Sequence, residues 1–413
     1  MKENEAILKR ETFHLRFKNE DMDFMLNWAI GIGQIVGLST SQVFYAIHPI
    51  KDGDPKGWCD GFSKLGDFQT GQAESSAQSR QAVAAGEAYL GAAYAYRSAI
   101  QYTNPFAPEF AERISQMEKT FQNGIRQLGV PMQPVEVPYA GTSLPGYFLE
   151  HDATPRPLVL MVGGGDTFCE DLFYFAGYPG WKRGYNVMMV DLPGQGITPN
   201  RGLHFQVDMA EPISTILDWL EAHAAVKPQQ IAIYGVSGGG YFTAQAAAHD
   251  PRIQAWVAAT PILDMGELFR TEFGVAMKAP GWLVNTVMRL AGTINVSAEI
   301  NLAKYAWQFG VSDFKYASEQ VILQAKKVDY TAITCPSLFL VSEGETPGLI
   351  RQAHTVYDNF VQRGVPVRLQ EFSAVQGADA HCELNNLRLA HLIIFDWLDQ
   401  LFSHDSGDIR LRC

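Results

Sequence analysis

The segment QIAIYGVSGGGYFTAQAAAH, residues 230–249, joins a short apolar run to a helix-forming run. The run QIAIY predicts a buried strand, and YFTAQAAAH predicts a helix. Between them lies Gly235-Val236-Ser237-Gly238-Gly239, a G-x-S-x-G pattern. A tight strand-to-helix turn needs small residues two positions before and after the serine, because its backbone closely approaches neighbouring backbone. The segment therefore predicts a serine hydroxyl lifted above the edge of a sheet.

The segments around this turn alternate between strand-forming and helix-forming sequence. Short apolar runs without alternation predict strands that are covered on both faces, as in a parallel sheet. A hairpin is expected over residues 135–150, and the buried runs occupy residues 157–163, 186–194, 230–239, 254–261, 337–344 and 367–373. Together with the turn at Ser237, this order predicts an α/β-hydrolase fold over residues 133–413: a mostly parallel eight-stranded sheet flanked by helices.

Two further regions are expected to be helical. Residues 1–132 predict an all-helical N-terminal module, because apolar positions recur there at three- and four-residue steps: Ala82, Ala85, Tyr89, Ala93, Tyr96 and Ile100. Residues 264–330 predict a helical insertion between two strands. Because ligands of α/β sheets bind at the carboxyl ends of the strands, the insertion is expected to form a lid. The alternative is that it only packs or dimerises.

A serine hydroxyl becomes a useful nucleophile when a base accepts its proton and a carboxylate orients that base. His381 lies in a polar loop between the last predicted strand and the final helix, the expected position of the base. His354 and His391 lie in helical runs, where packing or solvated roles are more common. The sequence therefore predicts Ser237 as nucleophile and His381 as base.

The third member of this triad has several candidates. The loop after the strand SLFLV contains Glu343 and Glu345 and no aspartate. Glu345 is preferred because it follows the glycine of a turn and has a long arm to reach the imidazole, and Glu343 is the runner-up. Asp264 is a third option, because some members of the fold carry the acid one strand earlier.

The oxyanion hole is expected to combine the backbone N–H of Gly238 with an N–H from the loop Gly163–Thr167, at Gly164 or Gly165. Neither GKS/T nor G-x-G-x-x-G follows these glycines, so a nucleotide site is not predicted. The turn Asp191–Gly196 is expected to shape the loop beside the serine. We expect no cofactor and no metal.

Composition limits the possible partners. A net charge of -12 and a pI near 5.3 argue against nucleic-acid binding. Neither a secretory signal nor a membrane span is recognisable, so the expectation is a cytoplasmic protein with a small-molecule substrate. The five cysteines lack CxxC pairing and are expected to be reduced, and Cys382 is expected to pack beside His381.

The chain resembles an esterase-like family that contains dihydroxypseudooxynicotine hydrolase and fungal hydrolases that shorten heptaketide pigment precursors. The resemblance rests on AAYAYRSAIQY, VPYAGTSLPGYFL, GGGD, DLPGQG, GVSGGGY and the pair His381-Cys382. It implies a helical module over a Ser-Asp-His site, hydrolysis of carbon–carbon bonds next to carbonyls in several members, and a homodimer. A glutamate in place of the usual aspartate departs from the family pattern.

These observations predict a serine hydrolase that acts on a ketone or an ester through an acyl-serine. A medium-sized, partly aromatic or polyketide-like substrate is expected, because both helical regions are rich in aromatic residues. Two alternatives are an acyltransferase or cyclase that uses the same acyl-serine, and a non-catalytic binding protein with this fold.

Overall fold

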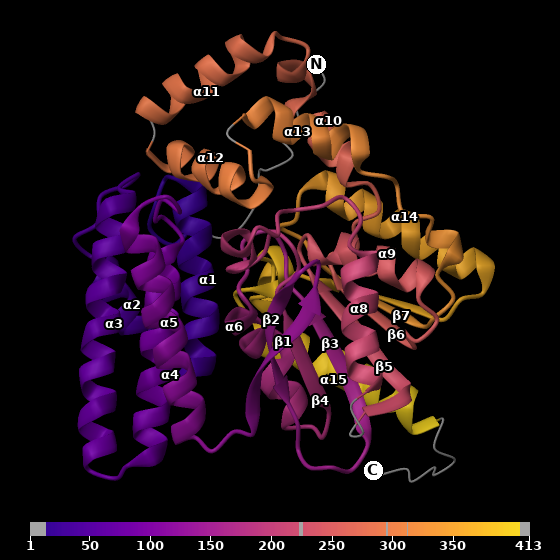
Figure 1. The fold of residues 1–413 in the computed structure, drawn as a ribbon, viewed down its shortest axis with the longest axis horizontal. Helices are drawn as coiled ribbons and strands as arrows, with labels where there is room; N and C mark the ends of the chain where they lie inside the picture. The colour runs from indigo at the N-terminus through magenta and orange to yellow at the C-terminus, as the bar shows by residue number, and fades with distance from the viewer. Residues whose placement is uncertain (1–13, 223–225, 295, 312, 405–413) are drawn as a thin grey trace. The chain divides into compact units, whose positions relative to one another are not determined.

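Strand β5 (Val226–Val236) and helix α9 (Gly239–His249) occupy the segment around Ser237. The computed structural model describes residues 14–222, 226–294, 296–311 and 313–404 (Figure 1). β5 lies inside an eight-stranded sheet of order β1-β2-β4-β3-β5-β6-β7-β8. β1 and β2 pair antiparallel, β2 joins β4 antiparallel, and the remaining pairs are parallel. The predicted mostly parallel eight-stranded sheet is confirmed.

The other strands follow the predicted apolar runs closely. Their bounds are β1 Met132–Tyr139, β2 Thr142–Leu149, β3 Arg156–Val162, β4 Asn186–Val190, β6 Ala255–Ala259, β7 Ser337–Ser342 and β8 Val367–Phe372. Every residue of β4, β6 and β7 is buried, as expected for strands covered by helices on both faces. β8 lies at the edge of the sheet and is mostly half-buried or exposed.

Helices cover both faces of the sheet. α8 (Ala210–Glu221), α9 and α14 (Pro347–Arg363) share one core with inward side chains of the strands, including Leu160, Ile233 and Phe339. On the opposite face lie α7 (Tyr178–Trp181) and α15 (Leu387–His404), where the Phe395 ring lies directly against Gly180. Shorter pieces are α6 (Cys169–Leu172), η1 (Phe173–Gly177), η2 (Thr198–Arg201), η3 (Tyr330–Ala332), η4 (Ala374–Gln376) and η5 (His381–Glu383).

A second compact unit is helical. Among the described residues, it contains 14–131 together with Phe273–Gln320, whereas Met132–Glu272 and 321–404 belong to the unit of the sheet. The N-terminal helices are α1 Glu20–Val36, α2 Thr40–Ile47, α3 Pro55–Gln78, α4 Ala82–Ile100 and α5 Pro108–Gln127. The insertion forms α10 Met265–Met277, α11 Gly281–Ile294, α12 Val296–Phe309 and α13 Phe314–Gln324.

Local signals explain where several of these helices begin. Asn19 accepts a hydrogen bond from the Met22 N–H at the start of α1, and Asp54 caps α3 ahead of Pro55. Long-range packing joins the insertion to the N-terminal helices, since the Phe110 and Trp307 rings meet edge to face with centroids 5.1 Å apart. In the described part of the chain, no helix has the length and apolar character needed to cross a membrane.

Candidate active site

Ser237 lies between the end of β5 and the start of α9, in a backbone conformation that side chains disfavour. Its φ of 56° is in the left-handed region, where a non-glycine residue costs on the order of 1 kcal/mol or more. Two hydrogen bonds hold the turn: the Ser237 N–H donates to the Ala259 carbonyl at 2.5 Å, and the Gly240 N–H donates to the Ser237 carbonyl at 2.8 Å. The conformation persists because the surrounding strands fix it.

The two glycines that flank the serine are required by close backbone contacts. A Cβ at Gly235 would lie 2.2 Å from the Gly239 carbonyl oxygen. A Cβ at Gly239 would lie 2.5 Å from the Val162 carbonyl oxygen. Both contacts are with backbone atoms, which cannot move aside as a flexible side chain can. Alanine at either position would therefore displace the turn that carries Ser237.

The imidazole of His381 joins the serine to a carboxylate. Its Nε2 lies 2.8 Å from Ser237 Oγ, and its Nδ1 lies 2.6 and 2.7 Å from the two carboxylate oxygens of Glu345. Thr260 Oγ1 also donates to Glu345 Oε1, at 2.8 Å. Because the Glu345 carboxylate can only accept, the hydrogen-bond partners assign the proton to Nδ1, and Nε2 then accepts from the serine hydroxyl.

The glycine loop after β3 passes directly beside this serine. A Cβ at Gly164 would lie 2.7 Å from Ser237 Cβ, and a Cβ at Gly238 would lie 3.6 Å from the Gly165 backbone nitrogen. Only a loop without side chains can come this close to the turn. The backbone of Gly164 and Gly165 therefore lies close to Ser237 and Gly238.

The family follows from a comparison with known proteins. A family model described as the alpha/beta hydrolase fold matches residues 157–400, more than half of the chain. The chain belongs to the α/β-hydrolase family.

This α/β-hydrolase has relatives that match it over nearly its whole length. The hydrolase LUC6 of a Fusarium species is 27% identical over 94% of this chain and 98% of its own. The 20-hydroxy-prefusarin hydrolase FUS2 of Gibberella moniliformis is 26% identical over the same shares of the two chains, 94% and 98%. The protein is thus an enzyme related to fungal hydrolases.

A solved structure shares the fold. The crystal structure of 2,6-dihydroxy-pseudo-oxynicotine hydrolase superposes with a TM-score of 0.67 and 20% identity, over 91% of this chain and 96% of that chain. With the fungal relatives, it confirms the predicted resemblance to this group of hydrolases.

Of the three candidate acids in this α/β-hydrolase, Glu345 is the one in contact with His381. Its side chain is buried, and its N–H donates to the Ser342 carbonyl at 3.1 Å, which closes a turn. Glu343 is exposed and accepts from the Ala374 N–H at 2.7 Å. Asp264 caps α10 by accepting from the Glu267 N–H at 2.7 Å. The runner-up candidates therefore have structural partners of their own.

The other two candidate histidines also have partners away from the serine. His391 lies on α15, and its Nε2 is 3.1 Å from the Tyr174 carbonyl. Burial lowers the pKa of His391 to about 4. His354 is partly exposed on α14 and pairs with Glu371 at 3.2 Å. A neutral, packed His391 and a solvated His354 match the roles that are common for histidines in helices.

The turn that carries His381 is anchored by its two following residues. Cys382 and Glu383 have φ values of 57° and 54°, again in the left-handed region. The buried Cys382 thiol donates to the Ala259 carbonyl at 3.0 Å, and the buried Glu383 carboxyl lies 3.1 Å from Ser342 Oγ. Burial, and after it the charge of Glu345, raises the pKa of Glu383 well above its usual range. The sequence analysis did not predict a role for Glu383. Its position directly after the pair His381-Cys382 was the signal that could have placed it beside the site.

One group of possible metal-binding side chains coincides with this site. Among the described residues, ligand atoms of Glu345, His381 and Cys382 lie within 4.8 Å of one another. Each of them already takes part in a hydrogen bond, with His381, Ser237 and Ala259 among the partners. The arrangement suits proton transfer along the side chains.

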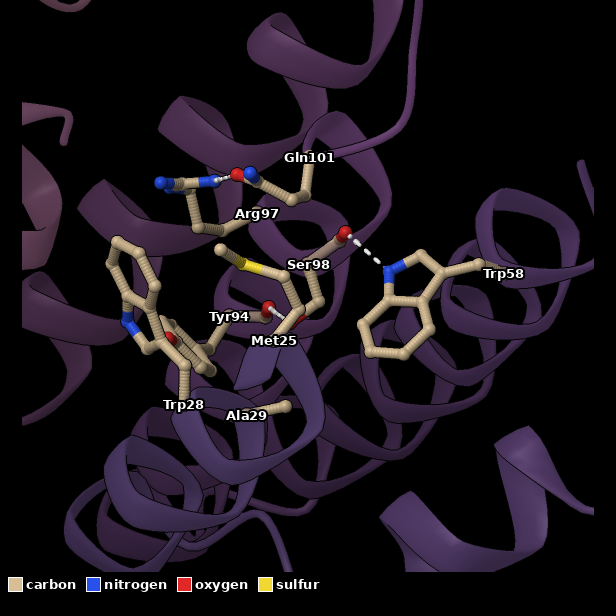
Figure 2. A pocket seen from close by; sticks show the side chains of 8 residues that line it. All are labelled: Met25, Trp28, Ala29, Trp58, Tyr94, Arg97, Ser98 and Gln101. Atoms are coloured by element: carbon tan, nitrogen blue, oxygen red, sulfur yellow. Dashed lines mark hydrogen bonds between the residues drawn. The ribbon is translucent and has the colours of Figure 1, made fainter. Parts of the chain in front are cut away.

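The helical unit contains a small cavity of its own (Figure 2). The buried Arg97 guanidinium lies 3.4 Å from Gln101 Oε1 and 5.3 Å from the centre of a Trp28 ring. Trp58 Nε1 donates to the Ser98 carbonyl at 2.8 Å on another side. Arg97 belongs to the AAYAYRSAIQY segment, so part of that segment packs inside this helical unit.

Proposed function

We propose that this enzyme is a serine hydrolase that cleaves a carbon–carbon bond beside a ketone, or an ester, in a small polyketide-like molecule. The observation that carries the proposal is the chain of hydrogen bonds from Ser237 Oγ through His381 to Glu345. This order of hydroxyl, imidazole and carboxylate is what acyl transfer to serine requires. Neither a metal nor a cofactor is needed for it.

In the proposed first step, Ser237 Oγ attacks the carbonyl carbon while its proton passes to His381 Nε2. The Glu345 carboxylate stabilises the imidazolium that forms, and the Gly238 and Gly164–Gly165 N–H groups donate to the oxyanion. The tetrahedral adduct then collapses. The bond to the leaving group breaks with its electron pair, the leaving group takes the proton from His381, and an acyl-serine remains.

In the second step, water replaces the leaving group. His381 accepts a proton from the water as its oxygen attacks the acyl carbon, and the proton then returns to Ser237 Oγ as the carboxylic acid leaves. For a β-diketone, the first leaving group is an enolate, which is stable enough to leave and is protonated by the imidazolium. The same residues thus serve ester and carbon–carbon cleavage.

The substrate class is supported by the relatives. FUS2 is named for 20-hydroxy-prefusarin and matches 94% of this chain. We therefore place this enzyme in fungal polyketide secondary metabolism. We also propose a domain boundary between residues 132 and 133. Residues 264–330 are proposed to act as a lid, and the enzyme is proposed to form a homodimer. Deletion of the α11–α12 hairpin would test the lid role, and light scattering would test the homodimer.

The test is covalent labelling followed by product analysis. A fluorophosphonate probe should add one adduct at Ser237 of the folded protein and none to Ser237→Ala. p-Nitrophenyl esters and aryl β-diketones are then offered, and products are identified by mass. Acid products support hydrolysis, whereas esters or lactones indicate acyl transfer or cyclisation. A folded protein that is not labelled at Ser237 would contradict the proposal and favour a binding protein.

A further inference from the structure

Gln195 lies in the turn after β4, with its side chain amide directed at the glycine loop. The residue is fully buried, and its Nε2 donates to the Gly163 carbonyl at 2.6 Å and to the Gly164 carbonyl at 2.8 Å. Its Oε1 accepts from the Leu192 N–H at 2.9 Å, and its own carbonyl accepts from Thr198 Oγ1 at 2.6 Å. Both ends of Gln195 are therefore fixed, and each amide N–H has a partner.

The two bonded carbonyls determine where the next two N–H groups point. In a planar trans peptide, the carbonyl and the following N–H point in opposite directions. Because the Gly163 and Gly164 carbonyls point at Gln195, the N–H groups of Gly164 and Gly165 point away from it. The loop lies against the serine turn at these residues, with a Gly164 Cβ position 2.7 Å from Ser237 Cβ. Gln195 thus sets the direction of two donors beside Ser237.

A loop of consecutive glycines needs hydrogen bonds that fix the orientation of its peptide planes. Glycine adopts both signs of φ with little cost, so a peptide plane between two glycines can rotate and turn its carbonyl toward the site. A carbonyl oxygen there would repel a developing oxyanion, whereas an N–H stabilises it. A primary amide supplies two N–H donors for two carbonyls, and glutamate or methionine supplies none.

We infer that Gln195 is a positioning residue for the oxyanion hole, acting through the Gly163–Gly164 and Gly164–Gly165 peptide planes. The inference rests on the proposed function, because it assumes that Ser237 forms a tetrahedral adduct. Because the Gln195 side chain is fully buried, we place it outside direct contact with the substrate. Its contribution is to transition-state stabilisation rather than to substrate binding.

The experiment compares Gln195→Glu and Gln195→Met with Gln230→Glu. Gln230 is a matched control: it is buried, its Nε2 donates to the Phe402 carbonyl at 3.1 Å, and it lies in the middle of β5, away from the end that leads into Ser237. kcat and KM are measured with a p-nitrophenyl ester, per active site titrated with the fluorophosphonate probe. Affinity for an aryl trifluoromethyl ketone, which forms a tetrahedral adduct with serine, is measured in parallel.

Both Gln195 variants should lose about 10- to 100-fold in kcat with KM nearly unchanged, which is less than the roughly 100- to 1,000-fold for deletion of an oxyanion donor, because the donors are misdirected and not removed. Ketone affinity should fall by a similar factor, and Gln230→Glu should match the wild type in both measurements. A folded Gln195→Met with wild-type kcat and ketone affinity, or with a raised KM alone, would overturn the inference. Failure of the proposed function is distinguishable, because the wild type itself would then bind neither probe covalently, and both proposals would fall.

Discussion

Glu345 and Glu383 are both buried beside the end of β7, and their surroundings demand different charges. Glu345 accepts from His381 Nδ1 at 2.6 Å and from Thr260 Oγ1 at 2.8 Å, so its partners are donors. Glu383 meets Ser342 Oγ at 3.1 Å, but that hydroxyl also lies 3.0 Å from the Ala378 carbonyl. Glu345 is thus surrounded by hydrogen-bond donors, whereas the hydroxyl beside Glu383 is shared with another acceptor.

The hydrogen-bond partners of Ser342 favour a protonated Glu383. A hydroxyl has one hydrogen, and a carbonyl can only accept, so Ser342 satisfies Ala378 by donating to it. Ser342 Oγ is also within donor distance of Glu383 Oε1, at 3.1 Å, but its one hydrogen cannot serve both acceptors, and a proton on the carboxyl removes this conflict. The raised pKa of Glu383, caused by burial and by Glu345, agrees with this. The comparison teaches that hydrogen-bond partners, rather than residue type, determine where the site keeps its negative charge.

The largest effect is expected from removing the charge of Glu345. Glu345→Gln should lower kcat by about 1,000-fold, because an amide can donate to Nδ1 and favour the wrong imidazole tautomer. Glu343→Gln is the control and should stay within about two-fold, as expected for an exposed carboxylate outside the site. Steady-state kinetics on a p-nitrophenyl ester measures both. If Glu343→Gln loses rate and Glu345→Gln does not, the assignment of the acid is wrong.

A smaller effect is expected from weakening one partner of Glu345. Thr260→Val deletes the hydroxyl that donates to Glu345 Oε1 while keeping the shape of the side chain. kcat should fall about 5- to 10-fold, equivalent to roughly 1 kcal/mol, the net value of one ordinary hydrogen bond. Thr260→Ser, which keeps the donor, should restore most of the rate. Equal rates for the valine and serine variants would show that this hydrogen bond does not support the carboxylate.

A substitution at Ser342 tests the environment of Glu383 separately from that of Glu345. Ser342→Ala removes the hydroxyl and leaves the buried carboxyl without that partner, which should destabilise the fold by about 1–3 kcal/mol. kcat at 25 °C should change by no more than about two-fold, because the hydrogen bonds of Glu345 are untouched. Urea denaturation and kinetics on the same preparation separate the two effects. A large loss of kcat without loss of stability would contradict this division.

The smallest effect on turnover is expected for Glu383→Gln, whose amide replaces a neutral carboxylic acid. Because the folded pKa of Glu383 is raised, the unfolded chain loses this proton first as pH rises above its usual value near 4.5. Wild-type stability should therefore decline relative to Glu383→Gln as pH increases through the raised pKa, and the two proteins should be most alike at low pH. Urea denaturation at pH 5, 7 and 9 tests this; a constant difference would mean that Glu383 is ionised.

Much of the fold could be predicted because short segments of the sequence determine its strands and turns. The strands β3 to β7 are apolar runs, and the glycines around Ser237 mark the turn directly. Chain order also placed His381 and Glu345 in the loops that the structure brings to Ser237, and their catalytic roles stay predictions. Sequence reasoning did not find Gln195 and Glu383, since their hydrogen-bond partners lie 31 to 41 residues away along the chain. The packing of α12 with α5 likewise depends on a contact distant in sequence.

The Ala259 carbonyl oxygen accepts hydrogen bonds both from the Ser237 N–H and from the Cys382 thiol. The segments that carry the nucleophile and the base are therefore tethered to a single main-chain atom at the end of β6. Side-chain replacement cannot delete that atom. Small movements of β6 would carry both segments along together, so the spacing between hydroxyl and imidazole would tolerate sequence drift elsewhere in the sheet.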